Sequence, residues 1–382
     1  MKKILLVLLA VVLVGAGCTQ GTSGPATAKS ERSQVVKSIN QADYFSGSEA
    51  ECKDAFMRSR MSQTDFQLAL DRAAGDPAAP LNFVVSLHTC DDKLVNEPEL
   101  FQTSATNLKQ LTRLLAEYGG APVVEVSKKF IEYAVEFNDD SLAAVLDAGG
   151  GVTLHLHEDY VIPSYLGQDF QGVSRGQTIA ENASPDVWRA ALIEYKDDVE
   201  AYIGRPVTGF SGGPWMPDKL EILSELGIEY TLGYKDTQTR LVPADLLVVN
   251  PWRPAGLNSA DDIAAYDPDG PIIYLPPGVK PAHCREPDNL PTPFSYASFD
   301  YLTSVLNATL AAADPDKVNV FYFVIHPWDF TGPEDFALWQ DWLDRVLSPA
   351  LADGRVRFAT FDEVAASYEA WEKREPYKGE GT

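Results

Sequence analysis

Short apolar runs alternate with amphipathic stretches along most of the chain. Runs of four to eight apolar residues bounded by turn residues indicate buried strands, and apolar positions at three- and four-residue spacing indicate helices that bury one face. The predicted strands cover residues 82–87, 122–126, 152–157, 207–210, 229–232, 246–250, 272–275, 318–325 and 356–359. The predicted helices cover residues 99–118, 141–147, 185–203, 217–226, 299–312, 333–347 and 361–371. Such alternation is typical of βαβ units around a mostly parallel sheet, so we expect an α/β fold, open or closed as a barrel.

The first eighteen residues have a different pattern. Lys2 and Lys3 precede an apolar run over residues 4–14, and small residues then lead to Cys18. A basic start, a short apolar core and a small-residue cleavage site are typical of a secretory signal, and the run is shorter than the roughly 20 residues needed to span a bilayer. Cys18 is placed as in a lipoprotein cleavage box, although Gly15 stands where that box usually has Leu. We expect residues 1–18 to be a lipoprotein-type signal, with secretion or an uncleaved anchor as alternatives.

Acylation of Cys18 would attach the protein to a lipid bilayer, at the outer face of the cytoplasmic membrane or elsewhere outside the cell. Residues 19–48 are expected to form a flexible tether, and residues 49–80 a helical extension in which Ser62 and Asp65 have the spacing of a capping box. Residues 81–375 then form the α/β unit, because barrels of this class often exceed the usual length of one domain.

Composition narrows the classes of function. The 382 residues include 55 Asp and Glu against 31 Lys and Arg, a formal net charge of −24, and 45% of the chain is hydrophobic. The chain can therefore bury a large core, and its charge argues against nucleic acid or an anionic surface as the main partner. Four cysteines are too few for a disulfide scaffold. These totals describe a folded, acidic protein of enzyme-like composition.

Chemically active residues lie at the carboxyl ends of four of the predicted strands, where βα barrels place their active sites. Residues 88–92 are His-Thr-Cys-Asp-Asp, residues 155–159 are His-Leu-His-Glu-Asp, residues 211–215 are Ser-Gly-Gly-Pro-Trp, and residues 326–329 are His-Pro-Trp-Asp. Four of the five histidines of the chain lie at three of these strand ends. We therefore expect one site at this edge of the sheet.

The spacing of His155 and His157 points to metal binding. Side chains two residues apart on a strand point to the same face, and two imidazoles with a carboxylate from a neighbouring strand make a catalytic metal site with an open water position. The alternative is one buried, hydrogen-bonded histidine and one on the surface. The adjacent carboxylates Asp91 and Asp92 favour the metal site, because one can bind the ion while the other acts as a base.

Taken in order, these motifs resemble the polysaccharide deacetylases, the NodB-homology group also called carbohydrate esterase family 4, over about residues 80–375. The resemblance implies a distorted (β/α) barrel of about seven parallel strands. It also implies Asp91 as base, Asp92, His155 and His157 as metal ligands, and His326 as general acid. The family usually has three residues between its two histidines, and strict spacing would replace His157 by Asp159.

The third motif departs from the family. Gly209-Phe210-Ser211 is followed by Gly-Gly-Pro-Trp, so Ser211 stands where the family has an Arg that orients the catalytic Asp. Arg253 or Arg285 could substitute for it. We expect Trp215 and Trp328 to stack on sugar faces, and Ser211 and Arg253 to line the substrate site.

The resemblance implies hydrolysis of N- or O-linked acetyl groups on a cell-surface or extracellular polysaccharide or oligosaccharide. One divalent metal would be required, Zn by default, with Co, Ni or Mn as alternatives. A non-catalytic carbohydrate-binding lipoprotein and a metal-independent glycoside hydrolase with two carboxylates remain open. Cys90 could form a disulfide with Cys284 or Cys52, or these thiols could be free.

Overall fold

The computed structural model describes residues 80–234, 248–278 and 299–374. The expected signal sequence, the tether and residues 49–79 of the helical extension lie outside the described residues, as do Cys18, Cys52, Cys284 and Arg285. Within the described ranges, no helix is both long enough and apolar enough to cross a membrane.

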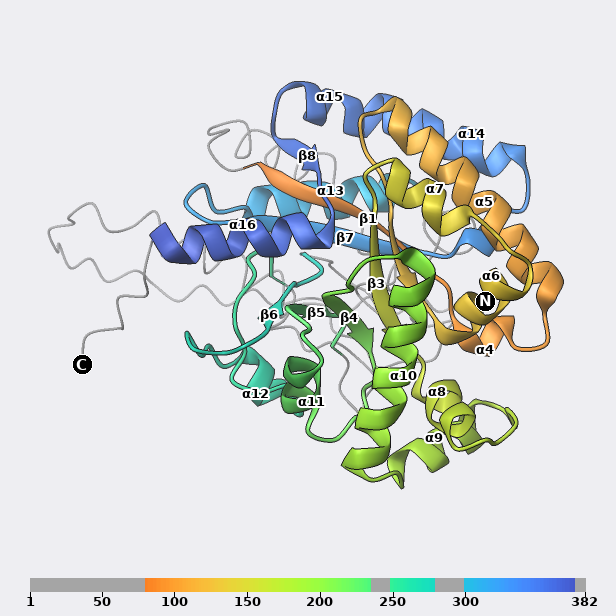
Figure 1. Ribbon diagram of the computed structural model, residues 1–382. Helices are drawn as coiled ribbons and strands as arrows, with labels where there is room; N and C mark the ends of the chain where they lie inside the picture. The colour runs from red at the N-terminus through yellow and green to blue at the C-terminus, as the bar shows by residue number, and fades with distance from the viewer. Residues whose placement is uncertain (1–79, 235–247, 279–298, 375–382) are drawn as a thin grey trace, which may run out of the picture.

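A parallel sheet forms the centre of the fold. Its strands are β1 (Leu81–His88), β2 (Val123–Val126), β3 (Gly151–Leu156), β4 (Gly209–Gly212), β5 (Tyr230–Leu232), β6 (Ile273–Tyr274), β7 (Asn319–Ile325) and β8 (Val356–Phe358). The spatial order is β6-β5-β4-β3-β2-β1-β7, and β8 pairs with the first residues of β1. Every ladder is parallel. The seven strands of this order curl into a half-barrel, so the expected (β/α) barrel class is confirmed (Figure 1).

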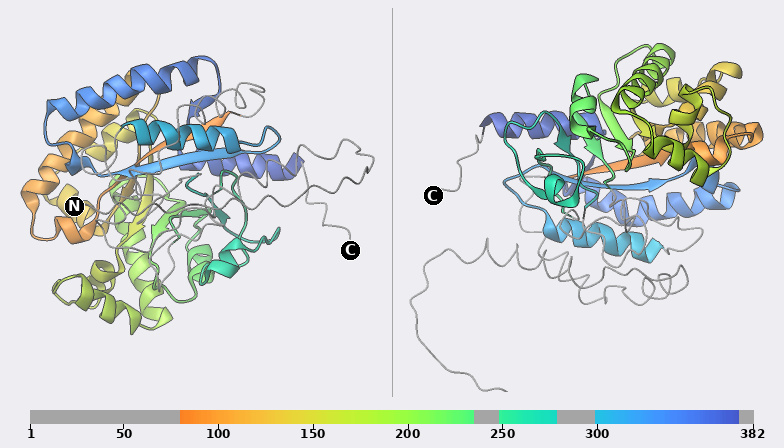
Figure 2. Two further views of the ribbon diagram at one scale, coloured as in Figure 1. Left: turned by 180° about the vertical axis from the view of Figure 1, so that it is seen from behind. Right: turned by 90° about the horizontal axis from the view of Figure 1, so that it is seen from below.

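Helices alternate with the strands, and most of them cover the outer face of the sheet (Figures 1 and 2). They are α4 (Asp91–Leu94), α5 (Pro98–Glu117), α6 (Lys128–Glu136), α7 (Ser141–Asp147), α8 (Glu158–Tyr165), α9 (Val173–Glu181), α10 (Pro185–Ile203), α11 (Lys219–Glu225), α12 (Ala260–Ala264), α13 (Phe299–Ala312), α14 (Pro333–Trp342), α15 (Ser348–Ala352) and α16 (Phe361–Arg374). Short turns of other helical types follow β7 as η2 (Pro327–Asp329) and extend α14 as η3 (Leu343–Leu347).

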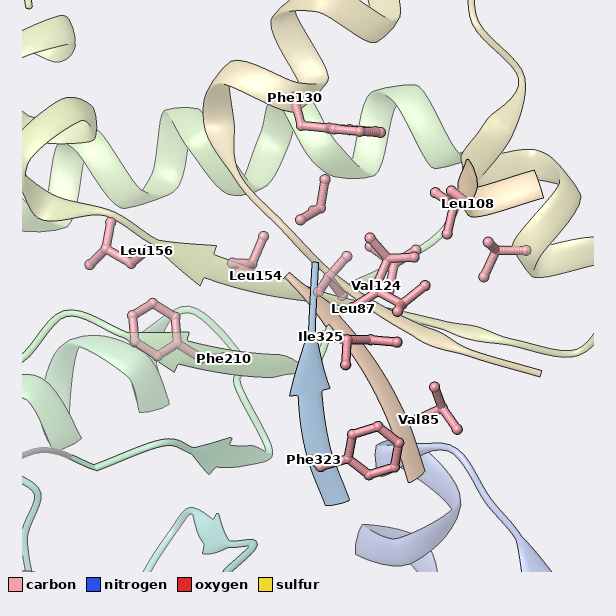
Figure 3. Packing of buried hydrophobic residues seen from close by; sticks show 14 of the residues in the cluster. Val85, Leu87, Leu108, Val124, Phe130, Leu154, Leu156, Phe210, Phe323 and Ile325 are labelled. Carbon is pink, nitrogen blue, oxygen red and sulfur yellow. The ribbon is translucent and has the colours of Figure 1, made fainter. Parts of the chain in front are cut away.

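The outer core lies between the strands and these helices. Val85 and Leu87 of β1, Leu154 and Leu156 of β3 and the neighbouring apolar strand residues face Leu108 of α5 and Phe130 of α6 (Figure 3). Successive side chains of a strand point to opposite faces. Since these apolar residues face the outer helices, the residues between them face the inner side of the sheet.

The inner face is divided between apolar and polar residues along its strands. Near the strand starts, Val84, Val123, Tyr230 and Tyr322 form a second buried cluster with Phe361 and other residues of α16. The Tyr322 and Phe361 rings meet edge to face at 5.1 Å. Helix α16 therefore fills the amino-terminal end of the half-barrel, and the polar residues remain at the carboxyl end.

Some expected elements differ from the structure. Residues 248–250 of the expected strand 246–250 are not a strand, and Asn250 instead donates its side-chain amide to the Val318 carbonyl. The expected helix 333–347 changes winding at Leu343 and becomes η3. Six short helices were not predicted, because their apolar positions do not extend over three regular turns, namely α4, α6, α8, α9, α12 and α15.

Candidate active site

Four imidazoles and one thiol converge at the carboxyl end of the sheet. His88 ends β1 and Cys90 follows it by two residues, His155 and His157 lie two apart on and after β3, and His326 follows β7. Side chains two residues apart on a strand point to the same face, and all five residues are in register with the inward-facing positions of their strands. Their side chains therefore meet on the inner face of the sheet. Ring centroids of His88 and His155 lie 4.0 Å apart, and those of His155 and His157 lie 4.9 Å apart. The expectation that His155 and His157 share one face is confirmed.

Cys90 is the residue that these imidazoles surround. Its Sγ atom lies within 4.8 Å of a ring nitrogen of each of the four histidines. Two groups of three possible ligand atoms share this sulfur, namely Cys90 with His155 and His157, and Cys90 with His88 and His326. The thiol is buried and is not in a disulfide.

Each imidazole has an oxygen partner on one ring nitrogen. His88 Nε2 lies 2.7 Å from Glu125 Oε2, and His155 Nδ1 lies 2.8 Å from Ser211 Oγ. These two pairs follow from the strand register, because His88 is opposite Glu125 in the β1–β2 ladder and His155 is opposite Ser211 in the β3–β4 ladder.

The other two imidazoles take partners from the helical segments that follow their own strands. His157 Nδ1 lies 3.5 Å from Asp159 Oδ1, and His326 Nδ1 lies 3.3 Å from Asp329 Oδ2. Partners of this kind fix ring orientation and tautomer, as is common around metal-binding histidines.

Asp91 and Asp92 begin helix α4, which starts three residues after His88, the last residue of β1. Asp91 is fully buried, and its Oδ1 accepts a 2.6 Å hydrogen bond from the Lys129 amide at the start of α6. Asp92 keeps 23% of its side chain exposed, and its Oδ1 lies 4.0 Å from His157 Nδ1. The two carboxylates therefore have different partners, and both lie in the first turn of a helix and not on a strand.

The expected ligand set is brought together only in part. In the described part of the chain, Asp92 is absent from the groups of three ligand atoms that lie within 4.8 Å of one another, whereas Cys90 is in two of them. Asp159 is buried and reaches the His157 ring. Both carboxylates therefore flank His157, and the thiol occupies the centre.

Burial and charge together set the ionisation of this cluster. Burial opposes ionisation of the Cys90 thiol, but the charges of His326 and His157 hold its pKa well below the usual value. Burial and the charge of His88 lower the pKa of His155 to about 4. Burial raises the pKa of Asp91 to about 7, although the charge of His157 opposes this. Burial lowers the pKa of His326, but the charge of Cys90 and the contact with Asp329 outweigh it and raise that pKa to about 10.

The residues expected to bind substrate are spread over two regions. The Trp328 ring is half-buried and stacks on the His326 ring at 4.6 Å, and Trp215 is half-buried in the segment after β4. Ser211 is only 2% exposed and contacts His155. The structure records no contact between Ser211 and Asp91 within the described residues.

Arg253 lies far from the cluster. Its guanidinium binds Glu372 at 2.9 Å and the Gly270 carbonyl at 2.9 Å. Glu372 shares a hollow with Lys317 and Val318, which immediately precede β7, whereas His326 follows the last residue of that strand. Seven residues of β7 span roughly 20 Å, so Arg253 does not join the imidazole cluster.

The sequence interpretation missed two members of the site. Glu125 is fully buried and also accepts a hydrogen bond from the Ser86 hydroxyl, yet it lies within the apolar run 123–126. A lone carboxylate in such a strand signals a buried partner, because an unpaired buried charge is costly. Cys90 was considered for a disulfide, although its two-residue spacing from His88 already places both side chains on the inner face.

Comparisons with known proteins identify the fold. No family model matches the sequence. No curated protein sequence matches it either. The structure of Puue allantoinase is 14% identical with a TM-score of 0.51, over 79% of this chain and 92% of that chain. A structure described as a polysaccharide deacetylase from Mycobacterium smegmatis is 17% identical with a TM-score of 0.47, over 78% of this chain and 96% of that chain.

A structure described as a polysaccharide deacetylase from Pseudomonas aeruginosa PAO1 is 13% identical with a TM-score of 0.49, over 79% of this chain and 93% of that chain. This chain therefore shares its fold with the allantoinase. Because a shared fold does not establish a shared function, the activity of this chain must be argued from its own residues.

Proposed function

We propose that this protein is a metal-dependent hydrolase that removes N- or O-linked acetyl groups from a carbohydrate polymer outside the cytoplasm. The observation that carries the proposal is the convergence of four imidazoles at the carboxyl end of a (β/α) half-barrel, where the buried Asp91 begins the helix that follows β1. This end of the sheet is where folds of this class perform their chemistry. The order of the sequence motifs supports the same reaction.

The donor set fits a divalent metal ion. His155 and His157 would hold the ion, because both are buried or nearly so and both have an oxygen partner on Nδ1. Buried imidazoles held by outer partners are the usual ligands of Zn, Co and Ni. When bound, the ion would polarise an acetyl carbonyl and lower the pKa of a water molecule.

Asp91 is suited to accept the proton of the attacking water. Its carboxylate is fixed by the Lys129 amide, and its raised pKa, about 7, lies near neutrality, where a general base is most effective. His326 is suited to protonate the leaving amine or alkoxide. Asp329 lies 3.3 Å from its Nδ1, and 17% of the His326 side chain is exposed.

Carbohydrate is the substrate class that the aromatic residues support. Trp328 lies half-buried against His326, where its indole can pack against a pyranose ring next to the acid. Trp215 follows β4, whose Ser211 contacts His155, and offers a second ring. Aromatic faces combine apolar area with little conformational entropy, which suits sugars.

Export and anchoring are part of the same proposal. The pattern of residues 1–18 supports acylation at Cys18, which would hold the enzyme at the outer face of the membrane near a surface polymer. Replacing Cys18 by Ser should release the protein into the medium. Unchanged membrane retention of a variant whose signal has been cleaved would contradict lipidation.

Acetate release tests the activity directly. The purified chain is supplied in turn with Zn, Co, Ni or Mn and assayed on N- and O-acetylated oligosaccharides, with allantoin included because an allantoinase shares the fold. We expect release from at least one acetylated sugar, and loss of release with His155→Ala. Binding of sugar and metal without any release would support the non-catalytic lipoprotein instead.

A further inference from the structure

The Cys90 sulfur lies where it could serve as a ligand of the metal ion. This sulfur lies at the centre of the imidazole cluster, 3.9 Å from His155 Nε2. A ring nitrogen of His157 is also within 4.8 Å of both atoms, so the three side chains offer three ligand atoms to one point. Asp92, the expected carboxylate ligand, is 23% exposed, and its oxygens lie 4.0 Å from His157 Nδ1 and 3.8 Å from Lys93 Nζ.

The tautomer of His155 shows how its inner nitrogen is used. Ser211 Oγ lies 2.8 Å from His155 Nδ1 and 3.3 Å from the Leu154 carbonyl oxygen. The single hydroxyl proton can be donated to that carbonyl, so the hydroxyl accepts a hydrogen bond from Nδ1–H. Glu125 Oε2, 3.7 Å from Nδ1, also favours a proton there. The lone pair of Nε2 is then directed at the sulfur of Cys90.

The lone pairs of Cys90 Sγ and His155 Nε2 face each other at 3.9 Å, so a proton or a metal cation is needed between these two atoms. A neutral thiol offers His155 Nε2 only a weak S–H donor across this distance. A divalent cation bound by the thiolate and two imidazoles satisfies all three ligands at once, and it leaves a fourth position open for water or substrate.

We propose that the Cys90 thiolate, together with His155 and His157, binds the catalytic metal, in the place where a carboxylate was expected. The proposal rests on the proposed function only in assuming that this cluster binds a metal. The thiol gives up its proton to solvent as the sulfur–metal bond forms. Sulfur ligation selects Zn or Co over Mn, because thiolates prefer softer ions.

Cobalt reports sulfur ligation without reference to activity. The purified chain is stripped with a chelator and titrated with Co²⁺, and a thiolate-to-cobalt charge-transfer band should appear in the near ultraviolet. The band should vanish in Cys90→Ser and persist in the matched control Cys284→Ser. Because loss of an outer partner typically weakens metal affinity 10–100-fold, loss of this direct ligand should weaken Zn affinity by more than about 100-fold.

A measurement on the unaltered protein removes any dependence on folding of the variant. The alkylation rate of Cys90 is followed by peptide mass spectrometry with and without one equivalent of Zn²⁺. We expect strong protection of Cys90, with the rates of Cys52 and Cys284 unchanged. Equal alkylation of Cys90 in the metal-loaded and stripped protein would overturn the proposal.

The role of Asp92 separates the two ligand sets. Under the proposal, Asp92→Asn keeps stoichiometric Zn and the cobalt band. If Asp92→Asn loses the metal while Cys90→Ser retains it, a carboxylate holds the ion, so sulfur ligation is wrong and the proposed hydrolase still stands. If the unaltered chain binds neither Zn nor Co, both proposals fail.

Discussion

His88 Nε2 and Glu125 Oε2 lie 2.7 Å apart in the interior of the half-barrel, directly opposite each other in the β1–β2 ladder. Glu125 has no exposed surface, and His88 is 6% exposed. Each partner stabilises the charged form of the other against the effect of burial. The pKa of His88 is therefore raised to about 9, and the pKa of Glu125 is lowered. Glu125 also lies 3.7 Å from His155 Nδ1, so this buried pair contacts the imidazole cluster directly.

The pair predicts a strongly non-additive stability cycle. In the metal-free protein, Glu125→Leu leaves an uncompensated buried His88 and should cost about 3–5 kcal/mol of unfolding free energy. The double variant His88→Leu with Glu125→Leu should recover most of that loss, since no buried charge remains. Urea unfolding of both single variants and the double variant measures the coupling. Additive losses would show that the two side chains act independently.

Ser211 predicts two opposite substitution effects. Ser211→Ala removes the partner of His155 Nδ1 and should weaken metal affinity about 10–100-fold with the fold retained. Ser211→Arg, which would restore the family's residue, should instead destabilise the protein by about 3 kcal/mol or more, because the site is 2% exposed and would hold an unpaired charge. Metal titration and thermal unfolding test each variant. A stable and more active Ser211→Arg protein would contradict the observed packing.

Asp91 predicts a loss of rate without loss of metal. Asp91→Asn keeps the shape that accepts the Lys129 amide hydrogen bond but cannot take a proton. Turnover should fall about 10²–10⁴-fold, the usual contribution of a general base. Metal stoichiometry should not change. Asp262→Asn, an exposed carboxylate on α12, is the control and should leave turnover as it was. Equal turnover of the Asp91 and Asp262 variants would exclude Asp91 as the base.

Tyr195 predicts a link between helix α10 and the metal site. Its buried hydroxyl donates to the Val126 carbonyl and lies 3.3 Å from the His155 carbonyl, so it ties the ends of β2 and β3. Tyr195→Phe should cost about 1–3 kcal/mol, because buried carbonyl groups lose a partner, and should also weaken metal binding. Tyr202→Phe on the same helix removes a bond to the Asp139 carbonyl and should cost stability alone. Identical effects on metal affinity would remove the proposed link.

The sequence by itself determined the strand and helix succession over most of the described chain. Helices 141–147, 185–203 and 299–312 have the predicted bounds, because their apolar spacing and their flanking Pro, Ser and Gly residues are local signals. The same holds for the inward direction of His155 and His157, which follows from the two-residue period of a strand. Local periodicity is sufficient to predict helix bounds and side-chain directions, because these depend on residues nearby in the sequence.

Only the tertiary structure decided which inward side chains meet. The pairing of His88 with Glu125 depends on the β1–β2 register, and that of His155 with Ser211 on the β3–β4 register. Cys90 became the centre of the cluster because β1 lies between β2 and β7, a crossover that brings the late His326 beside the early His88. Contacts of this kind join residues up to 238 positions apart, and no local pattern encodes the register or the strand order that creates them.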